Sequence, residues 1–394
     1  MPAWLVVLAC AALMFYTDDY IIAGVLPEIA ADLHVTVGAA GQLVTVFSVT
    51  VAIAAPVLAV LTARTRPRVV LAVAAAVFAA ANLAAALTPS FTVLTAARIF
   101  AAAAAGAATP SLFALAARLS PPDRMGRNVA VVALGITGAV ALGVPAGTWL
   151  SALGGWRLTF AALAVAGLVT VAAVLAVLPA TTTTPAPAPW RERLRVLGAA
   201  PVTLGLSANI VLMFGSMMLL TYLAPFTAGL SEADLTARGA LFAVSGVAGM
   251  IGIWWGGRAT DRWGPDRTLA IGVAAFIASM VVLGALWLIR PVPVLVLWPL
   301  VALWGGAAFW NSPAVQVRLH RLAGDESAQA LALNTSGTYL GIAIGGAAGG
   351  AVIGLGATGA LPWCAACAGL VAFLLFHLAA RSGGRKPDVR LARP

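Results

Sequence analysis

Long uninterrupted apolar runs recur along the whole chain. A helix that spans a bilayer needs about 20 mainly apolar residues. Only 9% of the 394 residues are charged, whereas about a quarter are charged in a soluble protein. The runs are continuous and lack the alternation typical of outer-membrane strands. The sequence therefore predicts an all-α membrane protein with twelve transmembrane helices, at 3–26, 39–61, 69–88, 91–117, 128–152, 158–179, 201–228, 237–256, 268–289, 294–316, 328–354 and 359–380.

The basic residues gather in alternate loops. The first run lacks the basic segment and cleavage site of a secretory signal, so we interpret it as a retained first helix. Most of the 23 Lys and Arg residues then fall on the side of the N-terminus, which predicts a cell-membrane protein with both termini in the cytoplasm. The net charge of +10 is thus a topology signal that can also attract anionic lipid, and no nucleic-acid partner is expected. The residues concerned are Arg64, Arg66, Arg68, Arg118, Arg124, Arg127, Arg191, Arg193, Arg195, Arg258, Arg262, Arg267, Arg318, Arg321, Arg381, Arg385, Lys386, Arg390 and Arg393.

No metal site or cofactor is expected. Cys10, Cys364 and Cys367 lie in apolar spans, and the CxxC pair has no second pair of ligands nearby. His34 and His320 lie in predicted loops. There is no GxxxxGK[ST] motif for built-in ATP hydrolysis.

The chain divides near its midpoint. The Pro-rich stretch TTTTPAPAPWRERLRVLG (181–198) indicates a linker. We predict a six-helix bundle at 1–180, a cytoplasmic linker at 181–200, a second bundle at 201–380 and a basic tail at 381–394. Matches recur at an offset of 198, where Pro27 aligns with Pro225, 63–71 with 261–269, and 142–147 with 340–345. Parallel repeats are typical of transporters, whose substrate site lies between the halves. We expect a monomer.

The stretch GGRATDRWGPDR (256–267) resembles the cytoplasmic loop signature of the major facilitator superfamily. In the first half Arg64 is retained, but Ala63 replaces the expected acid and Arg66 the expected glycine. The resemblance implies gating roles for Arg64, Gly257, Asp261, Arg262, Gly264 and Arg267.

Three further stretches carry the resemblance. LTAARIFAAAAAGAA contains Arg98 and is similar to the family's span 4 motif, while GVPAGTWLSALGGWR is similar to the span 5 motif that marks exporters. FYTDDYIIAGVLPEIAADL resembles the span 1 signature, whose acid falls on Asp19. The resemblance extends over nearly the whole chain and implies a drug:proton antiporter similar to chloramphenicol-resistance and arabinose-efflux-permease-like exporters.

Asp18, Asp19 and Arg98 are the ionisable residues expected at membrane depth, where charge is costly and marks proton or substrate pathways. Counting from the predicted outer ends of spans 1 and 4, Asp19 and Arg98 both lie about 10 to 12 Å below the outer interface. Our hypothesis is that Asp19 binds the proton and Arg98 tunes it, because desolvation favours the neutral acid and a guanidinium favours the carboxylate. The alternative is a static Asp19–Arg98 pair that locks two helices.

Asp18 points about 100° away from Asp19 around a helix. It could face span 4 or span 5, bind a cationic part of a substrate, or be a neutral acid bonded to a neighbouring helix.

Gly143, Pro145 and Gly147 in span 5 permit close helix approach and a kink, so simple packing explains them as well as an exporter role does. Asp261 and Arg262 could hold an outward-open state through contacts at the cytoplasmic ends, or serve only as topology-determining charges.

Polar and aromatic residues within the spans are candidates for a substrate cavity. Their mixture suits a lipophilic, antibiotic-like molecule better than a heavily hydroxylated sugar. They are Tyr16, Tyr20, Gln42, Asn82, Asn209, Met213, Tyr222, Trp310, Asn311, Asn334 and Tyr339.

The predicted function is proton-coupled efflux of a small, largely apolar compound by alternating access. Export of sugars or other metabolites is the alternative. A multi-pass enzyme that holds Mg²⁺ on the two acids is a remote third possibility, because such a site needs several oxygen ligands and the repeat would go unexplained.

Overall fold

The computed structural model describes residues 1–62, 64–121, 124–180, 196–231 and 234–383. Within these residues, twelve helical segments are long and apolar enough to cross a membrane, which confirms the predicted spans. The helices are α1 (Ala3–Asp32), α2 (Val37–Leu61), α3 (Pro67–Leu87), α4 (Phe91–Leu119), α5 (Met125–Gly138), η2 (Ala139–Gly143), α6 (Val144–Gly154), α7 (Trp156–Val177), η3 (Val196–Gly198), α9 (Ala200–Thr221), α10 (Leu223–Ser231), α11 (Leu235–Trp263), α12 (Pro265–Trp287), α13 (Val294–Ala323), η4 (Gly324–Glu326), α14 (Ser327–Gly354), η5 (Thr358–Ala360) and α15 (Leu361–Gly383).

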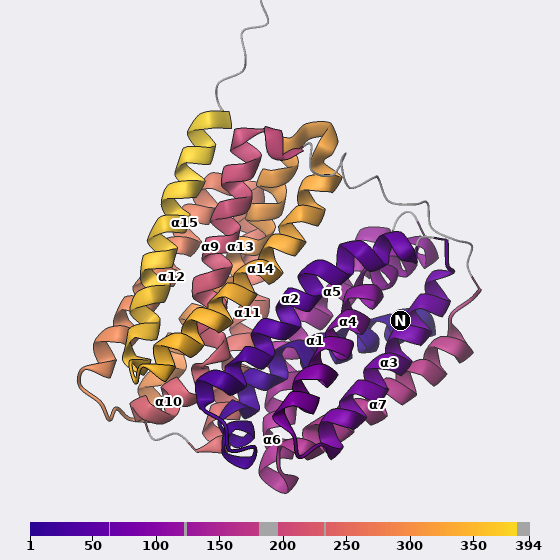
Figure 1. Ribbon diagram of the computed structural model, residues 1–394. Coiled ribbons are helices and arrows are strands. Elements are labelled where there is room, and N and C mark those ends of the chain that lie inside the picture. Colours follow the sequence, from indigo (N-terminus) through magenta and orange to yellow (C-terminus); the bar gives the residue numbers. More distant parts are fainter. Residues whose placement is uncertain (63, 122–123, 181–195, 232–233, 384–394) are drawn as a thin grey trace, which may run out of the picture.

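The helices form two groups that follow the sequence (Figure 1). In the first half, α3 packs against α4 and α7; in the second, α11 packs against α13 and α9 against α15. The halves meet where α2 packs on α14 and where α11 packs on α6 and η2. Of the predicted linker and tail, 181–195 and 384–394 lie outside the described residues, and the domain boundaries stay predictions.

We call the side where α2 ends and α3 begins the arginine-rich face, and the other side the opposite face. Close contacts between the halves occur toward the opposite face. A Cβ atom added to Gly38 of α2 would lie 2.6 Å from the Gly350 carbonyl oxygen of α14. Farther along α2, a Cβ atom added to Gly41 would overlap the side chain of Tyr222 from the second half. Small residues thus let the halves touch through their backbones.

Helix α1 is longer than predicted, because Pro27 lies inside it instead of ending it. A non-helical residue, Val25, bends the helix before the proline, and the helix continues to Asp32. Asp19 is therefore 13 residues from the end of α1, about 20 Å along its axis. The acid lies near the middle of its helix, and its predicted depth below the outer interface stays a prediction.

The predicted fifth span is a composite of α5, η2 and α6. Pro145 has no amide hydrogen to bond to Ala141, and the five residues Ala139–Gly143, which end two residues before it, form a π-helix. The amide of Val144 bonds back five residues to Ala139. The expected kink thus takes the form of a π-helical segment.

The predicted seventh span is also interrupted. Helix α9 ends at Thr221, Tyr222 leaves the helical conformation, and α10 begins at Leu223, with Pro225 inside it. The breaks at Val25 and Tyr222 lie just before the aligned prolines, Pro27 and Pro225. This agreement is consistent with two related halves.

Candidate functional site

Asp18 of α1 is paired with Arg98 of α4 deep within the first half. Nη1 of Arg98 donates to Oδ1 of Asp18 at 2.6 Å, and Nη2 donates to the Asp18 carbonyl oxygen at 2.7 Å. Both side chains are at most 1% exposed. The guanidinium also lies over the ring of Phe47, 4.3 Å from its centroid. The predicted Asp19–Arg98 pair was therefore wrong, since the neighbouring acid, turned by about 100°, occupies that position.

The surroundings of Asp18 belong to one half. Asn82 of α3 lies beside it. The Asn82 amide nitrogen donates to the Phe78 carbonyl at 3.1 Å, and Oδ2 of Asp18 accepts no hydrogen bond. Of the orientations predicted for Asp18, the structure has the one toward span 4. A charge pair this deeply buried is costly to break, because either partner alone would be an unpaired charge.

Asp19 faces the other half. Its side chain is 4% exposed, and its Oδ2 accepts a hydrogen bond of 3.1 Å from the Tyr339 hydroxyl of α14. Tyr16 and Tyr20 are close enough to interact electrostatically with the Asp19 carboxylate. The two adjacent acids thus point to different halves, one to an arginine and one to tyrosines.

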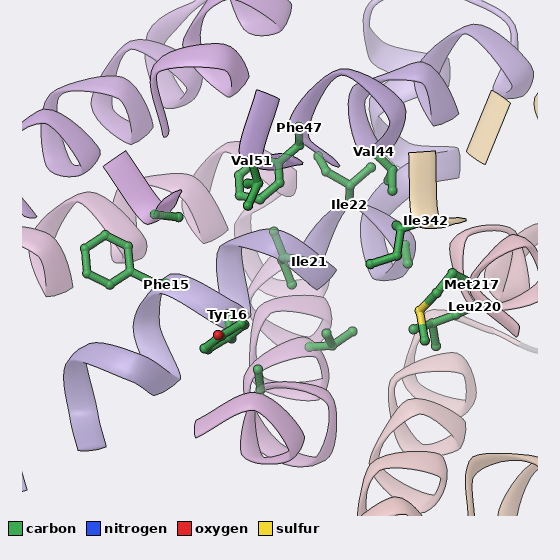
Figure 2. Packing of buried hydrophobic residues seen from close by; sticks show 14 of the residues in the cluster. Phe15, Tyr16, Ile21, Ile22, Val44, Phe47, Val51, Met217, Leu220 and Ile342 are labelled. Carbon is green, nitrogen blue, oxygen red and sulfur yellow. The ribbon is translucent and has the colours of Figure 1, made fainter. Parts of the chain in front are cut away.

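A narrow pocket lies beside Asp19, between the two halves. Figure 2 shows Val44, Ile342, Met217 and Leu220 converging from α2, α14 and α9. The pocket has room for about one water molecule. Met217 is the residue that aligns with Asp19 at the offset of 198, so aligned positions line the same pocket. The full lining is Asp19, Tyr20, Ala23, Val44, Met217, Leu220, Thr221 and Ile342.

Two predicted cavity residues form a polar cluster between α9 and α14. The Asn209 amide nitrogen donates to Oδ1 of Asn334 at 3.0 Å and to Oγ1 of Thr338 at 3.1 Å. Met213 packs against Gly341 on the same pair of helices. Thr338 was not predicted. A threonine hydroxyl in an apolar helix can bond to the backbone of its own helix, so its presence alone does not indicate a site.

Two other candidates belong to the seam between α2 and α14. A Cβ atom on Gly41 would overlap the Tyr222 ring, and one on Gly350 would lie 2.6 Å from Nε2 of Gln42. Tyr222 and Gln42 therefore fill the contact between the halves.

Trp310 and Asn311 face α12, within the second half. The Trp310 indole donates to the Thr268 carbonyl at 3.0 Å, and both side chains contact Gly272. Neither lines the pocket beside Asp19. Both side chains are packed between α12 and α13, and their role in a substrate cavity stays a prediction.

The span 5 motif lies directly against the segment of α1 that carries the acids. A Cβ atom on Gly143 would lie 2.0 Å from Oγ1 of Thr17, and one on Gly147 would lie 2.2 Å from Cδ1 of Ile21. On the other side, a Cβ atom on Gly246 of α11 would lie 2.2 Å from the Ala141 nitrogen. The π-helical segment therefore contacts both α1 and the second half.

The loop signature at the arginine-rich face is exposed. Asp261, Arg262 and Arg267 are exposed, as is Arg64 in the first half. Gly264 has a φ of +81°, which favours glycine, between α11 and α12. A side chain on Gly257 would meet nothing within 4 Å.

A buried arginine near this face was missed by the sequence analysis, which placed it in a loop. Arg318 lies inside α13, 4% exposed. Its Nη2 donates to the Phe376 carbonyl at 2.7 Å and lies 3.2 Å from Oδ1 of Asp266. The helix extends about two turns beyond its predicted end, which buries this residue against α12 and α15.

Two further ion pairs lie at the opposite face. Glu28 of α1 pairs with Arg238 of α11, at 3.0 Å, and so joins the two halves. Asp32 pairs with Arg157 within the first half, where Arg157 also donates to the Thr88 carbonyl. The sequence analysis indicated neither of these pairs.

Among the described residues, no three His, Cys, Asp or Glu side chains lie close enough together to hold a metal ion.

Comparison with known proteins places the chain among transporters. The family model described as Major Facilitator Superfamily matches residues 8–346. An uncharacterized MFS-type transporter, YbcL of Bacillus subtilis, is 30% identical over 93% of this chain and 93% of its own length. The chloramphenicol resistance protein of Streptomyces lividans is 34% identical over 69% of this chain and 70% of its own length.

Solved transporter structures share the fold. The D-xylose-proton symporter superposes with a TM-score of 0.78 at 17% identity, covering 95% of this chain and 96% of its own. The nucleoside transporter NupG has a TM-score of 0.80 at 13% identity, covering 96% and 99%.

Proposed function

Because the chain belongs to the major facilitator superfamily, we propose that it exports a small, largely apolar compound such as an antibiotic in exchange for protons. The arginine-rich face lies in the cytoplasm, together with both termini, as the distribution of basic residues favours. The protein works as a monomer in the cell membrane. The halves are in contact toward the opposite face, which closes the site on that side in this conformation.

The position of Asp19 is the observation that carries this proposal. Its carboxylate lies at membrane depth between the halves, while Arg98 is already paired with Asp18. An acid in this position is poised to change its proton and its hydrogen-bond partner as the halves rock. One proton that moves inward across 100 mV supplies about 2.3 kcal/mol, enough to accumulate a compound against a gradient.

Asp18 and Arg98 have a supporting role in this scheme. Their pair is internal to the first half, so rocking of the halves leaves it intact. It holds α1 against α4 and fixes the direction of Asp19. Alternating access follows from movement of the second half against this fixed unit.

The export direction is supported by one relative, the chloramphenicol resistance protein. The second candidate function is export of a sugar or another metabolite. Its specific support is the Asn209, Asn334 and Thr338 cluster, whose amides and hydroxyl can bind a polar compound.

The test is an accumulation and susceptibility panel in an efflux-deficient bacterium that expresses the full chain. We expect protection against at least one lipophilic antibiotic, lost on addition of a proton uncoupler and in Asp19→Asn. The matched control is Asp32→Asn, which changes an acid of the same helix away from the pocket and keeps export. Export that persists with the uncoupler would contradict proton coupling, and export of sugars alone would favour the second function.

A further inference from the structure

We propose that a pocket between α12, α13 and α15, near the arginine-rich face, binds the phosphate of an anionic phospholipid, with Arg318 as the residue that holds it. This would be a second binding site, and it does not depend on which compound is exported. The pocket lies within the second half. Figure 1 shows α12 and α15 at the edge of that half, away from the first half.

The guanidinium of Arg318 provides the first argument, because it has more donors than partners. Its contacts with the Phe376 carbonyl and with Asp266 are both made by Nη2. A guanidinium carries five N–H donors. Within the described residues, Nε and Nη1 of Arg318 have no hydrogen-bond partner, although this side chain is only 5% exposed and lines the pocket. Their N–H groups are therefore available to a ligand that enters the pocket.

The charges around the pocket favour an anion. Each of its three helices carries an exposed arginine within about one turn of a lining residue, and these are Arg267, Arg321 and Arg381. Asp266 is the acid of the lining, but its side chain is 62% exposed, and an ion pair with an exposed partner is weak. A phosphate can take its place, because a guanidinium donates two parallel hydrogen bonds to phosphate oxygens.

The position of the pocket favours a lipid over free phosphate. Arg318 is five residues from the end of α13, about 8 Å along its axis, which is near the level of the headgroups. The pocket has a volume of about 60 Å³, room for several water molecules and so for one phosphate group. On α15 the side chains of Phe373, Leu374 and Leu378 are exposed, and in a membrane they can contact acyl chains. Basic pockets between spans on the cytoplasmic side are typical sites for anionic headgroups.

Comparison with the first half indicates that the fold does not require this arginine. At the offset of 198, Arg318 aligns with Ser120, which carries no charge. Asp266 aligns with Arg68, and this arginine of α3 donates to the Leu175 carbonyl near the end of α7. The second half makes the similar bond to α15 from α13 instead, with a buried arginine beside an acid. A ligand for the remaining donors accounts for a buried charge that helix packing does not need.

The experiment is native mass spectrometry of the purified, delipidated full chain in detergent, with phosphatidylglycerol, phosphatidylethanolamine and inorganic phosphate as the probes. We expect phosphatidylglycerol to bind most tightly. Arg318→Gln should weaken this binding about tenfold, because it removes a charge-assisted hydrogen bond. Ala380→Leu, which fills the pocket and keeps the arginine, should weaken it as well. Asp266→Asn should strengthen it, since the competing carboxylate is gone. The matched control is Arg258→Gln, which removes an exposed arginine of α11 and should have no effect.

Three results would overturn the proposal. If inorganic phosphate binds as tightly as phosphatidylglycerol, the pocket is a site for a free anion. If phosphatidylethanolamine binds more tightly and loses this advantage in Asp266→Asn, the acid takes part in binding and the ligand is zwitterionic. If Ala380→Leu and Asp266→Asn both leave the binding of phosphatidylglycerol unchanged, the lipid binds elsewhere on the protein. Because both of these variants keep Arg318, the test remains decisive even if Arg318→Gln fails to fold.

Discussion

The two halves share their helix order but differ in the chemistry of their first helices. In α1 and α9 the aligned prolines, Pro27 and Pro225, each follow a break in the helix. At the positions aligned with Asp18 and Asp19, however, α9 carries Ser216 and Met217. Ser216 is fully buried in the second half, while Met217 lines the pocket with Asp19. The repeat thus specifies which positions face inward, whereas only the first half puts charge there.

The two halves also differ in the geometry of the helices that are aligned at the span 5 motif. In the first half Pro145 follows a π-helical segment, and in the second half Ala343 occupies the aligned position within the unbroken helix α14. The irregular helix packs against the acid-bearing part of α1, whereas the regular one carries Tyr339 across to Asp19. The first half therefore carries the two acids and the π-helical segment, and the second half provides Tyr339, the hydrogen-bond partner of Asp19.

The largest expected effect is on stability, where a substitution of Arg98 in the first half is compared with one of Ser216 in the second. Arg98→Ala leaves Asp18 as a buried, unpaired charge and should lower the free energy of unfolding by about 3 to 5 kcal/mol. Ser216→Ala, which removes a buried hydroxyl with no hydrogen-bond partner, should change it by less than about 1 kcal/mol. Unfolding of the purified protein in detergent measures both. The double variant Asp18→Asn with Arg98→Met should recover most of the loss. If Arg98→Ala and Ser216→Ala destabilised the protein equally, the energetic difference between the two halves would be disproved.

The next effect concerns the contact between Gly143 and α1. Gly143→Leu places side-chain atoms where Thr17 lies and should cost about 1 to 3 kcal/mol through overpacking, with loss of export. The control is Gly126→Leu in the same span, where an added Cβ atom would meet nothing within 4 Å. Thermal unfolding and transport are measured together. Unchanged transport in Gly143→Leu would reduce the motif to a sequence resemblance without a function.

The smallest effect compares the two ion pairs at the opposite face. Glu28→Gln breaks the pair that joins the halves and should favour separation there by up to about 1 kcal/mol, or fivefold in population. Asp32→Asn breaks a pair within one half and should leave that population unchanged. Labelling of a cysteine that replaces Gln42, which lies in the seam against Gly350, reports how far the seam is open. Equal labelling in both variants would mean that the Glu28–Arg238 pair does not hold the halves together.

Much of the site could be predicted from the sequence because charge in an apolar run stands out. Asp18, Asp19 and Arg98 were found in this way, and the constant offset indicated the two halves. Residues without such a signal were missed. Thr338 and Glu28 look ordinary in the sequence, and Arg318 resembled a loop arginine until the length of α13 placed it in the interior.

The sequence by itself determined that this chain forms twelve membrane helices in two related halves, with an acid pair in the first helix, since bilayer thickness and the cost of buried charge leave few alternatives. Only the tertiary structure decided that Arg98 pairs with Asp18 and that Tyr339 bonds to Asp19. Two neighbouring acids differ by about 100° around the helix axis, and α1 is apolar on every other side, so its sequence does not show how the helix is rotated. The packing of α1 against α4 and against the other half sets that rotation, and with it the partner of each acid.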